Sequence, residues 1–242
     1  MFDRLANATV RIVCGKWSGS GFHFLNEELI LTNYHIVEPH LTAGERITAY
    51  TEDKASTELE VLRLSPKDEY DFAILKLRRA LGRNREVLEP KQVDYMPRGT
   101  EVAFSGFPHG TSDLLVHRAF VSGPFCDLGF HVDGSVNGGN SGGPIVDVSD
   151  GKVVGVVTVR RMIGGKDLGE ISAESKDLQR YLDSIAGSGC VKLMGIDFSE
   201  FARLVARSLQ LMDAVINDNA NSGIGIGFHI RFALQACREL GY

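Results

Sequence analysis

The sequence predicts a mainly β protein, built as barrels or a sandwich, that continues into helices toward its C-terminal part. Residues 9–158 break into short β-branched runs separated by Gly, Pro and Asp, which is typical of closely spaced strands. The segment 78–99 is charged, contains Gly82 and Pro90 and has no sustained period, so we interpret it as a linker between two β halves. After residue 172 the apolar spacing changes to three and four, which indicates amphipathic helices.

Eleven strand candidates follow one another in the β part. Each is short, rich in β-branched or aromatic residues, and bounded by residues that favour turns. In chain order they are Thr9–Val13, Ser20–Leu25, Leu29–Thr32, Arg46–Thr51, Glu58–Leu64, Phe72–Leu77, Glu101–Ser105, Val116–Ser122, Gly129–Asp133, Pro144–Asp147 and Val153–Val159. We place one β half at 1–85 and the other at 97–171.

Residues 172–242 are predicted to be a helical extension or insertion. One apolar stripe consists of Leu178, Tyr181, Leu182 and Ile185, and a second consists of Phe198, Phe201, Val205, Leu209, Met212 and Ile216. Packing against the β halves is the expected role of both stripes, and docking of another protein is the alternative. A glycine-interrupted strand near 224–230 and a last helix over 231–240 follow.

Composition and charge exclude several classes of partner. The 242 residues carry a formal charge of −5 and no long basic run, so no nucleic-acid partner is expected. No apolar stretch approaches the roughly 20 residues of a membrane span, so no membrane partner is expected either. The first residues contain no secretory signal, which predicts a cytoplasmic location. The scattered His and Cys residues show no ligand spacing, so no metal and no cofactor is expected.

Three residues together indicate nucleophilic catalysis. Four glycines surround Ser141 in the run Asn137–Pro144, and such a turn exposes a hydroxyl and aims backbone N–H groups at one point. His35 follows an apolar strand candidate at a turn, and Asp71 opens another strand candidate. Each feature alone has an ordinary structural interpretation: a hairpin loop, a structural histidine or a turn aspartate. Together they supply a nucleophile, a base and a carboxylate that orients the base.

The segments GSGF at 19–22, LTNYHIV at 31–37, DFAILKL at 71–77, GFPHG at 106–110 and NGGNSGGPIV at 137–146 resemble the trypsin-like serine proteases, closest to the bacterial HtrA (Deg) branch. The resemblance covers residues 9 to about 160. It implies two six-stranded antiparallel β-barrels with the active site between them. His35 and Asp71 would come from the first barrel and Ser141 from the second.

The resemblance also implies the role of each site residue. His35 would accept the proton of Ser141, and Asp71 would hold the imidazole tautomer. The oxyanion hole would be the backbone of Gly139, Asn140 and Ser141, with the N–H groups of Gly139 and Ser141 as donors.

The same resemblance places a substrate-binding pocket. Its base would lie at Ser135 and one wall at Val156, Val157 and Thr158. A serine at the base argues against cleavage after Lys or Arg, because a buried cation would lack its partner.

The sequence departs at two points from the pattern of the proteases that it resembles. Digestive relatives carry an aspartate directly before the serine, which pairs with a new N-terminus, whereas here the residue is Asn140. We therefore expect no activation by N-terminal cleavage, and any regulation should be conformational. HtrA enzymes also usually continue into a PDZ domain, and none is recognisable here. Either the strand near 224–230 closes the second barrel after a helical insertion, or Gly169–Ser172 closes it and the rest is a tail.

The expected function is a bacterial serine endopeptidase that hydrolyses protein or peptide substrates. The alternative is a pseudoprotease or peptide-binding module that uses the same cleft without turnover. A further alternative is an enzyme held inactive until a regulatory protein partner docks on the helical segment. Both a monomer and a trimer are compatible with the sequence.

Overall fold

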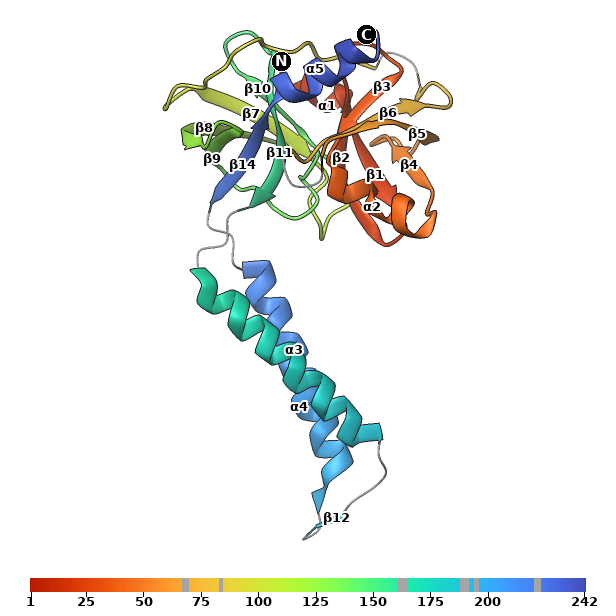
Figure 1. The fold of residues 1–242 in the computed structure, drawn as a ribbon, viewed down its shortest axis with the longest axis vertical. Coiled ribbons are helices and arrows are strands. Elements are labelled where there is room, and N and C mark those ends of the chain that lie inside the picture. Colours follow the sequence, from red (N-terminus) through yellow and green to blue (C-terminus); the bar gives the residue numbers. More distant parts are fainter. Residues whose placement is uncertain (67–69, 83–84, 161–164, 188–191, 194–195, 220–222) are drawn as a thin grey trace. The chain divides into compact units, whose positions relative to one another are not determined.

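The computed structural model describes residues 1–242 except 67–69, 83–84, 161–164, 188–191, 194–195 and 220–222. The chain divides into two compact units, one made of residues 1–161 and 223–242 and the other of residues 162–222. The first unit contains two closed antiparallel β-barrels of six strands each (Figure 1). The predicted fold class, two barrels with additional helices near the C-terminus, is confirmed.

The first barrel closes in the order β1-β2-β3-β6-β5-β4. Its strands are β1 (Thr9–Cys14), β2 (Trp17–His23), β3 (Leu29–Thr32), β4 (Ile47–Tyr50), β5 (Ser56–Leu64) and β6 (Ala73–Leu77). Alternate side chains of these strands point inward, and Val10, Ile12, Ile30 and Leu75 form part of the barrel core. Helix α1 (Phe2–Ala8) precedes this barrel, and α2 (Tyr34–Ala43) connects β3 to β4.

The second barrel closes in the order β10-β11-β14-β9-β8-β7. Its strands are β7 (Glu101–Gly106), β8 (Leu115–Phe125), β9 (Gly129–Asp133), β10 (Pro144–Asp147), β11 (Val153–Arg160) and β14 (Ile224–His229). Strand β14 pairs with both β11 and β9. Of the two closing strands considered above, the structure therefore has the later one in the barrel, whereas Gly169–Ser172 lies within helix α3.

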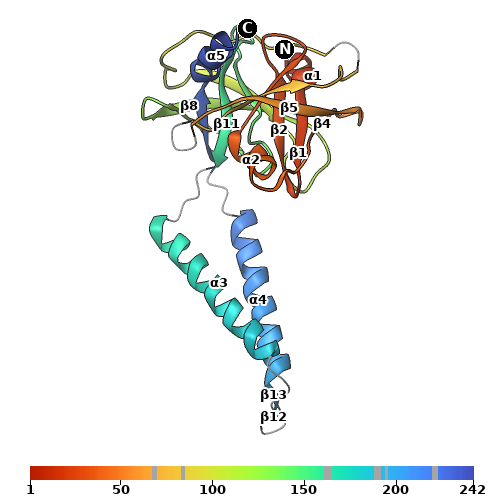
Figure 2. The same cartoon turned by 45° about the vertical axis from the view of Figure 1, so that its right-hand side comes forward.

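A shared apolar cluster joins the two barrels. It combines Phe22, Phe24 and Leu31 of the first barrel with Val146 and Val156 of the second. Helix α1 contributes Leu5, and the last helix, α5 (Ile230–Glu239), contributes Ile230 and Leu234. Figure 2 shows α1 and α5 at the same end of the barrels, at the top of the view. Burial of this cluster stabilises the contact between the two barrels. The candidate site lies where the barrels meet.

The second unit is a helical hairpin. Helix α3 (Gly165–Gly187) is followed by two short strands, β12 (Lys192–Leu193) and β13 (Ile196–Asp197), and then by α4 (Phe198–Asn219). The two helices run side by side and pack on each other (Figures 1 and 2). Helix α3 begins seven residues before residue 172, where the sequence predicts the helical part to begin. The boundaries predicted for the two β halves stay predictions.

Two helices were not predicted from the sequence. Helix α2 begins directly after Asn33, so His35 lies in the first turn of a helix rather than in the loop that the sequence predicts. Pro39 lies inside α2 and is a residue that normally indicates a helix end. Helix α1 is only seven residues long, too short for a clear 3.6-residue period.

Candidate active site

His35 and Asp71 meet because their strands are neighbours. Strands β3 and β6 pair with Thr32 opposite Ala73. The residues that follow Thr32 and those that precede Ala73 therefore lie close together. His35 Nδ1 lies 2.7 Å from Asp71 Oδ2, and the backbone N–H of His35 donates to Asp71 Oδ1 at 3.1 Å. Asn33 Nδ2 donates to the backbone carbonyl of Asp71 at 2.6 Å. The carboxylate therefore holds the imidazole by its Nδ1 side and leaves Nε2 free for proton transfer.

Thr158 of β11 contributes a contact that the sequence did not reveal. Its Oγ1 donates to Asp71 Oδ2 at 2.5 Å, across the boundary between the barrels. Burial raises the pKa of Asp71, but the hydrogen bond and charge of His35 and the hydrogen bond from Thr158 outweigh it, so that the pKa lies below its ordinary value. Asp71 is therefore ionised at neutral pH.

Ser141 lies in the glycine turn between β9 and β10. Gly139 has φ +93°, and a Cβ there would lie 2.2 Å from the carbonyl oxygen of Phe107. Gly142 has φ +85°, and its Cβ would lie 2.1 Å from the carbonyl oxygen of Ser20. Both positions thus require glycine, because the backbone is left-handed and another backbone lies against it.

The predicted oxyanion donors have no competing partner in the described part of the chain. There, neither the N–H of Gly139 nor that of Ser141 donates a hydrogen bond to a protein atom, whereas the N–H of Asn140 donates to Asn137 O at 3.1 Å. The Asn140 side chain is buried, and its amide atoms find no hydrogen-bond partner among the described residues. A free pair of N–H groups beside a serine is what a developing oxyanion needs.

Ser20 of β2 connects the first barrel to the glycine turn. Its buried hydroxyl donates to Gly139 O at 2.7 Å and accepts from the N–H of Phe107 at 2.9 Å. Its backbone N–H donates to Ser141 O at 2.7 Å. One residue thus fixes the peptide groups on both sides of the Asn140–Ser141 peptide. The GSGF motif at 19–22 was the only signal for it in the sequence.

The Ser141 hydroxyl is hydrogen-bonded to Thr158. Ser141 Oγ donates to the carbonyl oxygen of Thr158 at 3.0 Å. Within the described residues no hydrogen bond joins Ser141 to His35. Thr158 thus contacts both the nucleophile candidate and the carboxylate of the His35–Asp71 pair, which brings the serine and that pair to one region.

The residues of the predicted specificity pocket lie in different surroundings. Val156 and Val157 are 3% and 1% exposed and pack in apolar cores, so their side chains are not available as a pocket wall. Ser135 is exposed and lines none of the four cavities described for the chain. Thr158 is buried beside Asp71 and Ser141. The substrate-binding role predicted for Ser135, Val156, Val157 and Thr158 stays a prediction.

No group of three or more metal-ligating side chains occurs among the residues that the structure describes. In the same part of the chain, no helix is long and apolar enough to cross a membrane. The absence of metal, cofactor and membrane partners stays an expectation from the sequence.

Known proteins with similar sequences are serine endoproteases. A probable periplasmic serine endoprotease, DegP-like, from Brucella suis is 28% identical over 205 residues, which cover 81% of this chain and 38% of that protein. The protein of the same name from Rhizobium meliloti is 29% identical over 206 residues and is covered to 39%. The chain thus spans well under half the length of these relatives. Both relatives are named periplasmic, and the cytoplasmic location expected for this chain stays a prediction.

Solved structures agree with the fold. The Rv3671c protease of M. tuberculosis in an inactive form is 25% identical, with a TM-score of 0.54 over 67% of this chain and 82% of that one. The HtrA-type protease AlgW with a tripeptide is 19% identical, with a TM-score of 0.63 over 99% of this chain and 63% of that one. The family model described as "Trypsin-like peptidase domain" matches residues 19–156, which is more than half of the sequence. The chain therefore belongs to the trypsin-like peptidase family.

Proposed function

We propose that the chain is a serine endopeptidase that hydrolyses peptide bonds of proteins through His35, Asp71 and Ser141. The observation that carries this proposal is the His35–Asp71 pair, in which one carboxylate accepts both the ring Nδ1–H at 2.7 Å and the backbone N–H of the same residue at 3.1 Å. This arrangement orients an imidazole for proton transfer through Nε2. Family membership and the unoccupied N–H groups of Gly139 and Ser141 support it.

The reaction would proceed through an acyl-enzyme. Ser141 Oγ forms a bond to the scissile carbonyl carbon while His35 Nε2 takes the hydroxyl proton. The carbonyl oxygen becomes an oxyanion that accepts hydrogen bonds from Gly139 and Ser141, each worth roughly 2.7–4 kcal/mol in the transition state. The imidazolium then protonates the leaving amine as the C–N bond breaks. Water, deprotonated by His35, releases the acid and restores the hydroxyl.

The hydrogen bond from Ser141 to Thr158 supports a conformational control of this activity. Attack requires the Ser141 hydroxyl to leave Thr158 O and to donate to His35 Nε2 instead. A peptide substrate whose N–H donates to Thr158 O would displace the serine hydroxyl and favour that change of partner. We therefore propose that substrate binding, or a regulatory partner, engages the nucleophile.

The substrate side chain next to the scissile bond is proposed to be small or medium-sized and apolar. A serine at position 135 provides no carboxylate for a Lys or Arg side chain. Paired peptides that differ only in Val or Lys at this position would test the preference. The proposal expects a higher kcat/KM for the Val peptide, and a preference for Lys would contradict it.

The proposed function is tested by reaction with a fluorophosphonate, which needs an activated serine but no knowledge of the substrate. Mass spectrometry should locate the label on Ser141 alone, and Ser141→Ala should remain unlabelled. A matched control is Ser105→Ala, which removes a buried hydroxyl that is hydrogen-bonded to Thr9. Labelling of wild type and Ser105→Ala at other serines, or no labelling of Ser141 together with no hydrolysis of peptide substrates, would contradict the proposal.

A further inference from the structure

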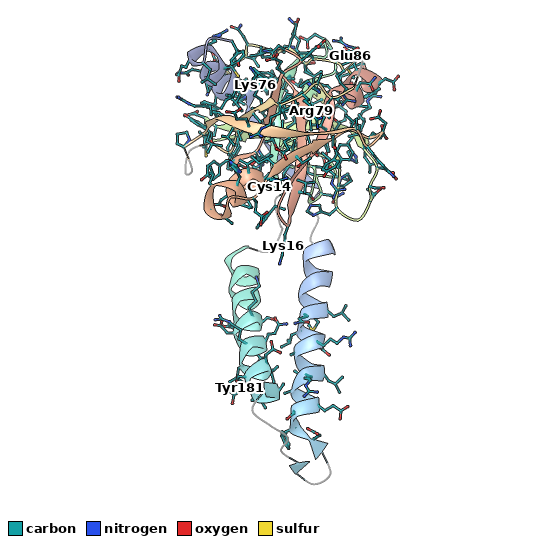
Figure 3. The ribbon with its side chains drawn as sticks, turned by 90° about the vertical axis from the view of Figure 1, so that its right-hand side faces the viewer. Cys14, Lys16, Lys76, Arg79, Glu86 and Tyr181 are labelled. Atoms are coloured by element: carbon teal, nitrogen blue, oxygen red, sulfur yellow. The ribbon has the colours of Figure 1, made fainter. Side chains whose placement is uncertain are left out.

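The carboxylate of Asp71 serves three donors at once, so its direction must be held closely. It accepts from the backbone N–H and the ring Nδ1–H of His35 at 3.1 and 2.7 Å, and from Thr158 Oγ1 at 2.5 Å. Asp71 itself lies outside the sheet, two residues before β6, the strand whose other end carries Lys76 (Figure 3). Pairing of β6 with its neighbours therefore does not by itself fix the peptide groups on either side of Asp71.

One buried hydroxyl holds both of these peptide groups. Ser65 directly follows β5 and is 4% exposed. Its Oγ donates to the carbonyl oxygen of Tyr70 and accepts from the backbone N–H of Phe72 at 3.1 Å. A hydroxyl has one proton to donate and two lone pairs, so both hydrogen bonds can form at the same time. The backbone N–H of Ser65 also donates to Phe72 O at 2.9 Å, which anchors Ser65 to the segment that leads into β6.

These two hydrogen bonds set the backbone direction of Asp71. The carbonyl of Tyr70 belongs to the planar peptide group before Asp71, and the N–H of Phe72 belongs to the one after it. The orientations of these two planes define the φ and ψ angles of Asp71 and so the direction of its Cα–Cβ bond. Asn33 Nδ2 holds the other edge of the second plane, because it donates to Asp71 O at 2.6 Å. The Ser65 hydroxyl thus fixes the direction from which the carboxylate meets His35.

Aromatic packing beside Asp71 cannot replace the hydroxyl. The Tyr70 ring stacks on Phe232 of α5, with ring centroids 4.0 Å apart. Ring contacts hold side chains in place, but they constrain the direction of a peptide group less than a hydrogen bond does, because a hydrogen bond weakens steeply with its angle. A cavity of about 410 Å³ lies against Ser65, Tyr70 and Phe72. The segment therefore has room to shift when the hydroxyl is removed.

We infer that Ser65 is a positioning residue, whose hydroxyl holds Asp71 in the direction that orients His35. This inference rests on the proposed function, because it concerns the same His35–Asp71 pair. It gives the first barrel a counterpart of Ser20, which holds the glycine turn. Because Ser65 acts through Asp71, its loss should affect kcat and the protonation of the base rather than the binding of substrate.

The test compares the kinetics of wild type and Ser65→Ala. The variant should lose about 10² in kcat, because a displaced carboxylate orients the imidazole poorly, and KM should change by less than about threefold. A weaker contact with Asp71 stabilises the protonated imidazole less. The acid limb of the pH profile of kcat/KM should therefore move to lower pH by about half a unit. Peptide hydrolysis between about pH 5 and pH 9 measures these quantities.

The matched control is Thr51→Val. Thr51 is also 4% exposed and lies in the same barrel, where its hydroxyl donates to Ala55 O at 3.2 Å in the turn between β4 and β5. Both variants lose a buried hydroxyl that holds a connection between strands, so the midpoints of urea unfolding should fall to a similar extent. Only Ser65→Ala should change kcat and the acid limb. A folded Ser65→Ala protein with the kcat and acid limb of Thr51→Val would overturn the inference.

A spectroscopic readout separates a failure of this inference from a failure of the proposed function. The Nδ1–H of His35 should give a far-downfield proton NMR resonance, which is assigned by its loss in His35→Ala and needs no turnover. The resonance should persist in Thr51→Val and be broadened or lost in Ser65→Ala. An unchanged resonance in Ser65→Ala would overturn the inference even if wild type hydrolysed no peptide, an outcome that would contradict the proposed function alone.

A second variant keeps the inference testable if Ser65→Ala does not fold. Ser65→Cys fills nearly the same space but weakens both hydrogen bonds, because a thiol is a weak donor and a weak acceptor. It should show the same changes in kcat, acid limb and resonance to a smaller extent. A Ser65→Cys protein that equals wild type in all three would overturn the inference.

Discussion

Replacing Ser20 by alanine should remove most of the activity while leaving the His35–Asp71 pair intact. The Ser20 hydroxyl is buried and holds the carbonyl of Gly139 at 2.7 Å and the N–H of Phe107 at 2.9 Å. Without it, two buried polar groups lose a partner, which costs about 1–3 kcal/mol of folding stability. The peptide groups around Gly139 then lose the hydrogen bond that holds them. The N–H of Gly139 is therefore no longer fixed in the direction that an oxyanion donor needs.

The expected effect on catalysis follows from the loss of one oxyanion donor. Such a loss costs about 2.7–4 kcal/mol in the transition state, so kcat should fall by about 10²–10³. KM should change by less than about threefold, because the oxyanion contact forms mainly in the transition state. The pH dependence of kcat/KM should keep its midpoint, since Ser20 touches neither His35 nor Asp71.

The matched control for this experiment is Ser105→Ala. Ser105 is also fully buried and also connects the barrels, through a hydrogen bond of 2.6 Å between its hydroxyl and Thr9 Oγ1, whereas among the described residues no hydrogen bond joins that hydroxyl to the glycine turn. It should lose stability of the same order while kcat stays within about threefold of wild type. Peptide hydrolysis and urea unfolding measure both quantities on each variant. A folded Ser20→Ala protein with the kcat of Ser105→Ala would refute the positioning role.

Three other outcomes are expected. Asp71→Asn should lower kcat by about 10⁴ without unfolding the chain, because the amide leaves His35 in the wrong tautomer. Stopped assays of peptide hydrolysis measure kcat, and a loss below tenfold would argue against the His35–Asp71 pair. Gly139→Ala should abolish fluorophosphonate labelling, because its Cβ would lie 2.2 Å from Phe107 O at a φ of +93°; normal labelling would show that the turn can rearrange. Stability should fall as pH drops from about 6.5 to about 4. Burial, with the Arg85 charge at His23 and the Arg231 charge at His229, lowers the pKa of each to about 4, so the unfolded chain takes up protons that the folded chain does not. This proton uptake lowers the free energy of unfolding at pH 5 by about 2 kcal/mol for each histidine. Urea unfolding at pH 7 and pH 5 measures the change, and equal stability at the two pH values would contradict the prediction.

Local sequence information was sufficient for the strands and for the triad candidates. β-Branched runs such as Leu29–Thr32 and Val153–Val159 reappear within one residue at either end, because their side chains fill the barrel interiors. His35 and Asp71 were identifiable because each follows or precedes such a strand, and Ser141 because glycines surround it.

Long-range contacts could not be predicted in the same way. Ser20 meets Gly139 across 119 residues and Thr158 meets Asp71 across 87, and no local pattern predicts either pairing. Strand β14 reaches its partner β11 only after the intervening hairpin, so its pairing depends on barrel closure rather than on its own pattern. The exposed position of Ser135 and the inward packing of Val156 and Val157 likewise depend on how the strands pack.

In the proposed mechanism Ser141 and His35 act as one catalytic unit. The most direct test is a double-mutant cycle on peptide hydrolysis with wild type, His35→Ala, Ser141→Ala and the double variant. The proposed mechanism predicts that each single variant loses as much activity as the double, because neither residue works without the other. Losses that multiply in the double variant, or undiminished hydrolysis by Ser141→Ala, would contradict it.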